Sequence, residues 1–131
     1  MSAVRGFFRA VLAVGFIVAG ANHFRTPDVY LGMMPAWLPW PAVMNAIAGA
    51  AEILGGIGVT FSSTRRAAGW GLIALLVAVF PANVHLALQG HMPGFDFKPL
   101  TLWLRLPFQA VFIAWVWWVA VKASSLTDSK D

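Results

Sequence analysis

Cysteine is missing from all 131 residues of this chain. Its absence excludes disulfide bonds, thiol catalysis, iron–sulfur ligation and thiolate zinc sites. Any redox chemistry would therefore have to reside in a bound cofactor.

Charged side chains are scarce as well. They make up 11% of the residues, against 60% hydrophobic, and the mean hydropathy is +0.74. Soluble domains average about 25% charged and about 45–50% apolar residues. A chain of this size has too small an interior to hide so many apolar side chains from water. The composition therefore predicts one integral membrane domain over residues 1–131, with the lipid bilayer as its solvent.

The net charge of +4 does not indicate a nucleic-acid partner. Its basic residues are not gathered on one face, as nucleic-acid binding requires, but lie at the ends of apolar runs. That placement suits membrane topology.

Four apolar stretches are long enough to cross a bilayer as helices, which takes about 20 residues at about 1.5 Å each. They cover residues 7–24, 42–61, 67–88 and 103–121. The first resembles a signal peptide but lacks a small-residue cleavage site, so we interpret it as a retained span. We predict an all-α bundle of four transmembrane helices, followed by a disordered polar tail over 123–131.

The cationic residues predict the orientation of these spans, because such residues favour the cytoplasmic side. With both termini in the cytoplasm, the inner side receives Arg5, Arg9, Arg65, Arg66, Lys122 and Lys130. The outer side then receives only Arg25, Lys98 and Arg105. The tryptophans agree, since Trp37, Trp40 and Trp103 mark the outer interface and Trp70, Trp117 and Trp118 the inner one.

The connections between the spans differ in character. Residues 62–66 form a short polar inner turn, whereas the outer connections, 25–41 and 89–102, are rich in proline and aromatic residues. Proline prevents a regular helix there, so we expect these segments in the headgroup region or as a cap over the bundle. The first and third spans end in similar Asn–His pairs, a pattern typical of a parallel 2+2 repeat.

Small residues at helical spacing predict close packing of the spans. The second span contains Gly49, Gly55, Gly56 and Gly58, and the first offers Gly15 with Ala19. We interpret both stripes as helix-packing faces rather than ligand sites.

Polar side chains within the spans are the candidate functional residues, because each is costly to place in lipid. They are Asn22, His23, Asn45, Glu52, Asn83, His85, Arg105 and Gln109. Nearly all fall in the outer half, and Glu52 alone lies near mid-membrane. Terminal Asn and His can instead cap helices or meet headgroups, and Arg105 can extend to the interface. Glu52 must be neutral, paired or facing water, and a purely structural bond to Arg105 or a histidine is an alternative.

Spacing refines this set. Arg105 and Gln109 are four apart and share a helix face, with Pro107 expected in the first helical turn. Asn83 and His85 are two apart, so on a regular helix one faces the core, and we expect it to be His85.

Three chemistries fit such a set of residues. A quinone site needs an apolar slot with donors for its carbonyl oxygens. Haem held between His23 and His85 is a second option, unsupported by any binding motif. A divalent metal on His23, His85 and Glu52 is a third, without the tight spacing of known sites.

The same residues carry a family resemblance. The motifs Asn22-His23-Phe24, Gly49…Glu52…Gly55, Phe80-Pro81-Ala82-Asn83-Val84-His85 and Arg105-Leu106-Pro107-Phe108-Gln109 together resemble the DoxX-like membrane proteins. The resemblance implies a four-helix bundle of the bacterial inner membrane. Some relatives are linked to redox work, as a thiosulfate:quinone oxidoreductase subunit or as partners of oxidant-defence enzymes. A eukaryotic relative is a receptor-assembly chaperone, so the fold does not guarantee catalysis.

By this resemblance we expect a quinone-linked redox or oxidoreductase-associated component, and whether it is an enzyme stays open. Glu52 and His85 are the expected catalytic residues, Glu52 to relay or hold a proton and His85 to help orient the quinone. The expected cofactor-binding residues are His23, Asn45, Asn83, Arg105 and Gln109. No metal is expected. The alternatives are an accessory subunit of a larger membrane complex and a small dimeric transporter. Expected partners are a membrane or peripheral redox protein, in a homo- or hetero-oligomer.

Overall fold

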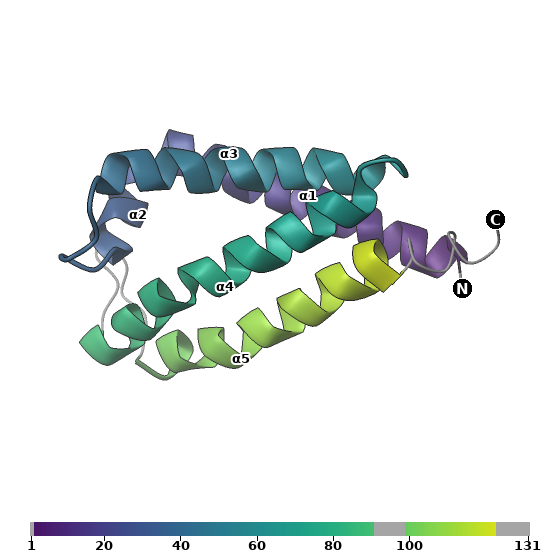
Figure 1. Cartoon of the computed structure of the whole chain (residues 1–131). Helices are drawn as coiled ribbons and strands as arrows, with labels where there is room; N and C mark the ends of the chain where they lie inside the picture. The colour runs from purple at the N-terminus through teal and green to yellow at the C-terminus, as the bar shows by residue number, and fades with distance from the viewer. Residues whose placement is uncertain (1, 91–98, 123–131) are drawn as a thin grey trace.

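The computed structural model describes residues 2–90 and 99–122, and this part of the chain folds into helices without a strand (Figure 1). The elements are α1 (Ser2–Arg25), α2 (Pro27–Met33), α3 (Pro41–Thr60), α4 (Arg65–Gln89), α5 (Pro99–Val116) and the π-helical turn η1 (Trp117–Lys122). Helices α1, α3, α4 and the combined α5–η1 segment are each long and apolar enough to cross a membrane. The predicted all-α bundle of four spans is confirmed.

Proline begins helices where the sequence predicted irregular chain. Pro27 and Pro41 lie in the first turns of α2 and α3, and Pro99 is the first residue of α5. The missing N–H of proline has no helical partner in the first turn, so proline is tolerated there. The prediction of irregular structure over 25–41 is therefore wrong for α2 and holds for residues 34–40. Residues 91–98 of the second predicted loop and the predicted tail lie outside the described residues.

Pro107 does not lie in a first turn, as the spacing predicted, because α5 begins eight residues earlier at Pro99. Pro81 likewise lies inside α4, which continues past it. Each proline leaves one carbonyl of its helix without the usual backbone donor. Membrane helices accept this because side chains of neighbouring helices can satisfy freed backbone groups.

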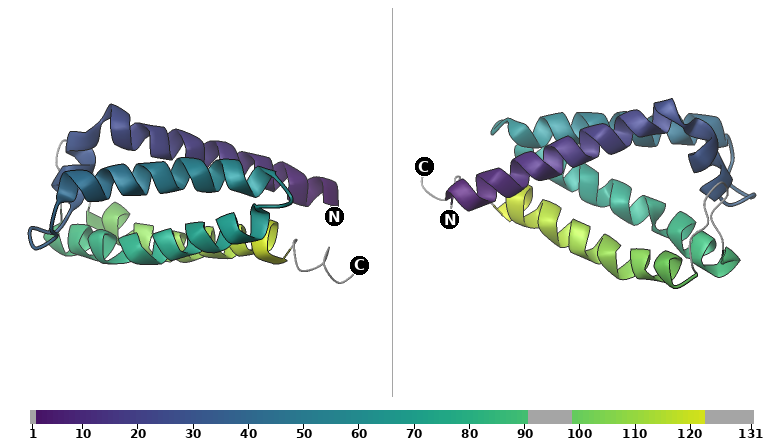
Figure 2. Two further views of the ribbon diagram at one scale, coloured as in Figure 1. Left: turned by 45° about the horizontal axis from the view of Figure 1, so that its top comes forward. Right: turned by 180° about the vertical axis from the view of Figure 1, so that it is seen from behind.

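The four long helices associate as two pairs. Helix α1 packs most extensively on α3, and α4 packs on α5 and η1, while α3 and α4 join the pairs. The pairs converge at the end that carries the α3–α4 turn and separate toward the end that carries α2 (Figures 1 and 2). We refer to these as the turn end and the α2 end. The start of α1 and the close of η1 both lie at the turn end.

A hydrophobic core occupies each end of the bundle. At the turn end, the central members are Leu12, Phe16, Val59, Leu72 and Val116. At the α2 end, Leu86 and Leu102 pack with Met33 and Ala87, and Val29 and Tyr30 lie against them. The short helix α2 thus closes the wider end of the bundle.

Glycines set the distance between α1 and α3. A Cβ added at Gly20 would lie 2.6 Å from the carbonyl oxygen of Gly49, and one at Gly56 would lie 2.8 Å from that of Ala13. Such a Cβ at Gly15 would meet nothing within 4 Å. The α1 packing face therefore contains Gly20, and the prediction that Gly15 belongs to it is wrong.

The opposite face of α1 is apolar and exposed, as lipid contact requires. Phe7, Val14 and Val18 are each more than 60% exposed, and Val11 completes the stripe at helical spacing. A water-soluble helix would carry polar residues on this face. The chain is an integral membrane protein.

The turn end is tied together by arginine side chains that reach backbone carbonyls. Arg65 Nε donates to the Val59 oxygen at 2.9 Å, satisfying one of the free carbonyls at the close of α3. Arg9 Nε donates to the Val119 oxygen of η1 at 2.8 Å. The π-helical turn interrupts the helix predicted over 103–121, and nothing in the sequence indicated it.

Candidate functional site

A cavity of about 490 Å³ lies between α1 and α5, where the helix pairs begin to separate. Leu12 and Phe16 of the turn-end core line it on one side, and Tyr30 beside the α2-end core lines it on the other. Two further lining residues, Val11 and Phe112, are 44% and 43% exposed. The cavity therefore opens sideways, toward the lipid, between α1 and α5.

The lining is apolar except at one end. The polar members are His23, Glu52, Tyr30 and Arg105; the apolar ones are Val11, Leu12, Gly15, Phe16, Ala19, Leu76, Phe112 and Trp115. Four helices and α2 each contribute at least one lining residue.

Asn45 holds His23 in place through two hydrogen bonds. Its amide Nδ2 donates to the backbone oxygen of His23 at 2.9 Å, and its Oδ1 lies 2.7 Å from His23 Nδ1. A backbone carbonyl can only accept, so this bond assigns Nδ2 and Oδ1 of the amide. His23 Nδ1 must then carry the hydrogen that it donates to Oδ1, and Nε2 of a neutral ring is left with a lone pair.

That free ring nitrogen faces a carboxylate. His23 Nε2 lies 3.5 Å from Glu52 Oε2, and the two side chains are 11% and 17% exposed. Glu52 Oε2 is buried and accepts no hydrogen bond from the described residues. Two bare acceptors this close would repel each other, so the geometry favours a proton between them, either as imidazolium with carboxylate or as imidazole with carboxylic acid. Of the two pairings expected for Glu52, the structure shows the one with histidine.

The Tyr30 ring stacks on one face of the His23 ring. The two ring centroids are 3.8 Å apart and the planes are inclined by 22°. Asn22 Nδ2 donates to the Tyr30 hydroxyl oxygen at 2.8 Å, which leaves the hydroxyl its own hydrogen to donate. Helix α2 thus fixes His23 from outside the four spans.

Arg105 and Gln109, predicted to share one face of α5, have different surroundings. Arg105 lines the cavity, whereas Gln109 is buried against α4. Asn83 Nδ2 donates to Gln109 Oε1 at 2.7 Å, and Gln109 Nε2 donates to the backbone oxygen of Leu76. Asn83 and Gln109 therefore join α4 to α5 and do not line the cavity.

His85 is placed differently from the expectation. The residue of the pair that contacts α5 is Asn83, while His85 is half-buried, does not line the cavity and bonds to no other described residue. The two Asn–His pairs look alike in the sequence but differ in geometry. Asn22 and His23 are adjacent, whereas Asn83 and His85 are two residues apart and point to different sides of their helix. Haem between His23 and His85 finds no support in this arrangement. Within residues 2–90 and 99–122, no three His, Asp or Glu side chains gather as a metal site, so a metal on His23, His85 and Glu52 finds no support either.

His23, Glu52 and Arg105 are the lining residues that the sequence predicted; among those it did not predict are the aromatic residues Tyr30, Phe112 and Trp115. Trp115 had a detectable signal, because it is the one tryptophan that the interfacial pattern leaves unassigned. Tyr30 is the single tyrosine of the chain. Its role depends on the unpredicted helix α2, so sequence spacing could not reveal it.

Comparison with known proteins identifies the family. The model of a domain of unknown function, DUF8561, matches residues 12–120. The chain belongs to the DUF8561 family. No curated protein and no solved structure matches it. The residues matched in this DUF8561 chain include every lining residue of the cavity except Val11.

Proposed function

We propose that this DUF8561 protein binds a quinone in the cavity between α1 and α5, as a redox component of the bacterial inner membrane. The observation that carries the proposal is the close pair His23–Glu52, 3.5 Å apart, in the lining of a mostly apolar cavity that opens between α1 and α5. Ligand sites of this kind are mostly apolar, with a few placed polar groups that fix orientation. The resemblance of the polar motifs to the DoxX-like proteins supports the same class of ligand.

The lining suits both parts of such a ligand. Its ring oxygens need donors, and the guanidinium of Arg105 and the hydroxyl of Tyr30 offer them. Its isoprenoid tail needs an apolar wall, which Leu12, Phe16 and the aromatic side chains of α5 provide. Glu52 lines the cavity, so its carboxyl group is placed to accept a hydrogen bond from a quinol hydroxyl.

A bound quinone supplies reversible uptake of electrons and protons at its ring oxygens. The chain contributes binding and proton handling. Arg105 and Tyr30 orient the ring, and the His23–Glu52 pair holds one proton beside the cavity. Asn45 acts as a positioning residue, because it keeps the Nε2 atom of His23 directed toward Glu52. Electron donor and acceptor would be a partner protein.

The proposal includes an orientation with both termini in the cytoplasm. Arg5, Arg9, Arg65 and Lys122 all lie toward the turn end, the end expected inside. The polar end of the cavity then lies in the outer half of the membrane.

Solvent extraction of the purified protein tests the proposal directly. We expect about one quinone per chain in the extract and quenching of tryptophan fluorescence when a short-chain quinone is added back. Glu52→Gln should weaken binding about 10-fold, since a hydrogen bond to a charged group contributes about 1.5–3 kcal/mol. Protein without extractable quinone that also shows no response to added quinone would overturn the proposal.

A matched pair of glycine substitutions locates the binding. A Cβ at Gly15 or at Gly71 meets nothing within 4 Å, so both positions accept a side chain. Gly15 lines the cavity and Gly71 does not. Gly15→Phe should abolish quinone binding, and Gly71→Phe should retain it. Equal binding by the two variants would place the ligand elsewhere.

A further inference from the structure

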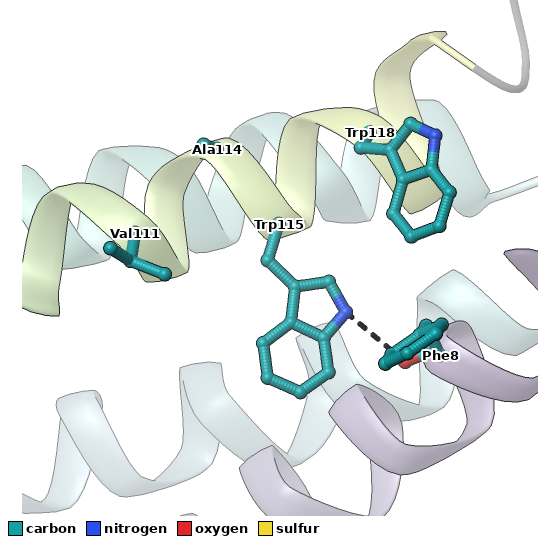
Figure 3. A pocket seen from close by; sticks show the side chains of 5 residues that line it. All are labelled: Phe8, Val111, Ala114, Trp115 and Trp118. Carbon is teal, nitrogen blue, oxygen red and sulfur yellow. Dashed lines mark hydrogen bonds between the residues drawn. The ribbon is translucent and has the colours of Figure 1, made fainter.

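We propose that a second site, a groove at the turn end, binds an anionic phospholipid, with Arg5 directed to the headgroup and an acyl chain along α5. This groove of about 310 Å³ is lined by Phe8, Val111, Ala114, Trp115 and Trp118 (Figure 3). It is separate from the quinone cavity, with which it shares only Trp115. The proposal does not depend on the proposed function.

Aromatic side chains build the groove between two helices. Figure 3 shows Trp115 and Trp118 extending from α5 and η1 toward Phe8 on α1. Trp115 Nε1 donates to the backbone oxygen of Phe8 at 3.2 Å, and the Phe8 ring lies 6.1 Å and 5.8 Å from the rings of Trp115 and Trp118. These contacts hold the walls in place without a ligand. The groove follows α5 from Trp118 to Val111, about 10 Å at about 1.5 Å per residue.

A positive charge lies against the ring of one residue that lines the groove. The Arg5 guanidinium carbon lies 5.6 Å from the ring centroid of Trp118. Arg5 Nε is buried and has no hydrogen-bond partner among the described residues, unlike Nε of Arg9 and of Arg65, which donate to carbonyls. Arg5 is therefore not fixed through Nε to a carbonyl of the fold, and its guanidinium is a donor group whose charge suits a phosphate oxygen.

The wider charge distribution selects an anionic lipid over a zwitterionic one. Arg9, Arg65, Arg66 and Lys122 accompany Arg5 at the turn end. The acidic residues in the described part of the chain are Asp28 and Glu52, and neither lies at that end. Basic pockets between transmembrane helices on the cytoplasmic side favour anionic headgroups in this way.

Native mass spectrometry of the detergent-solubilised chain tests this site, with phosphatidylglycerol and phosphatidylcholine of identical acyl chains as probes. We expect the wild type to retain phosphatidylglycerol preferentially. Arg5→Gln should weaken that binding about fivefold, the equivalent of about 1 kcal/mol for one cation near a membrane surface. Arg66→Gln, the same charge change at the same end but outside the groove, should leave it within twofold.

A third variant probes the groove without altering charge. Ala114 is exposed and lines the groove, so Ala114→Phe fills it while disturbing little of the fold. The fraction of protein that retains phosphatidylglycerol and the fraction that retains phosphatidylcholine should then both decrease. The proposal fails if Ala114→Phe binds phosphatidylglycerol like the wild type, or if Arg5→Gln and Arg66→Gln lose equal amounts. Quinone extraction from the same preparations shows whether the other cavity is still occupied.

Discussion

At the scale of single residues, Asn45 organises the candidate site. It touches His23 twice, once at the ring and once at the backbone, and it is 4% exposed. Asn45 does not line the cavity, but its bond to Nδ1 determines that Nε2 is the ring nitrogen that faces Glu52. Its loss would affect both stability and proton placement.

We expect Asn45→Ala to lower the free energy of unfolding by about 1–3 kcal/mol, because it leaves the ring nitrogen and the carbonyl of His23 without partners in a buried place. Thermal unfolding in detergent, followed by circular dichroism, measures this. Thr60→Ala removes an exposed hydrogen bond to the Ile57 oxygen and should change stability by less than about 0.5 kcal/mol. Equal losses in the two variants would contradict the role of Asn45.

The sequence predicted several residues of the candidate site correctly and assigned others to it that lie elsewhere. The cost of polar groups in lipid drew attention to His23, Asn45, Glu52 and Arg105, and the structure brings them together around one end of the cavity. The same cost applies to Asn83 and Gln109, which satisfy each other between α4 and α5. Hydropathy cannot distinguish residues that line the cavity from residues that join two helices. It indicates that a residue lies within the membrane but not which helix its side chain faces.

At the scale of elements, glycines let the α1 and α3 backbones approach closely. Gly20 and Gly49 lie opposite each other, and this approach brings His23 of α1 beside Asn45 and Glu52 of α3. The close approach thus creates the polar network as well as the helix pair. The α1–α5 side has no such glycine contact, and there the cavity opens.

We expect Gly20→Ala to destabilise the protein by about 1–3 kcal/mol, because its methyl group would overlap the Gly49 carbonyl. Gly6→Ala, in the same helix, meets nothing within 4 Å and should be neutral or stabilising by up to about 1 kcal/mol through helix propensity. Chemical denaturation in detergent compares the two. A Gly20→Ala protein as stable as Gly6→Ala would show that the helices can separate freely.

Element boundaries show where the sequence was informative. Apolar length alone predicted the four spans, because lipid imposes a minimum helix length. It did not predict α2, whose 7 residues lie among prolines. Pro27, Pro41 and Pro99 were treated as breakers of helices, whereas each begins one. Whether a proline interrupts a helix or begins one depends on its position in the helix. That position is known only when the first residue of the helix is known.

At the scale of the whole molecule, the bundle has two unlike ends. The turn end is narrow, basic and closed by arginine bonds to carbonyls, and the α2 end is wider and capped by a short helix. The charge asymmetry predicts that the turn end faces the cytoplasm.

The absence of cysteine makes this orientation simple to measure. Ala36→Cys places a single thiol in the exposed segment before α3, and Ser63→Cys places one in the α3–α4 turn. In intact bacterial spheroplasts, a membrane-impermeant maleimide should label the first variant and reach the second only after permeabilisation. The reverse pattern would invert the proposed topology.

Trp115 lines both the cavity and the groove. A ligand that shifts this ring on one side changes the shape of the space on the other. Such a coupling between two binding sites is reciprocal, since each ligand must alter the affinity for the other by the same factor. If both proposed sites are filled in the cell, the lipid composition of the membrane would set the affinity for the quinone through a single side chain.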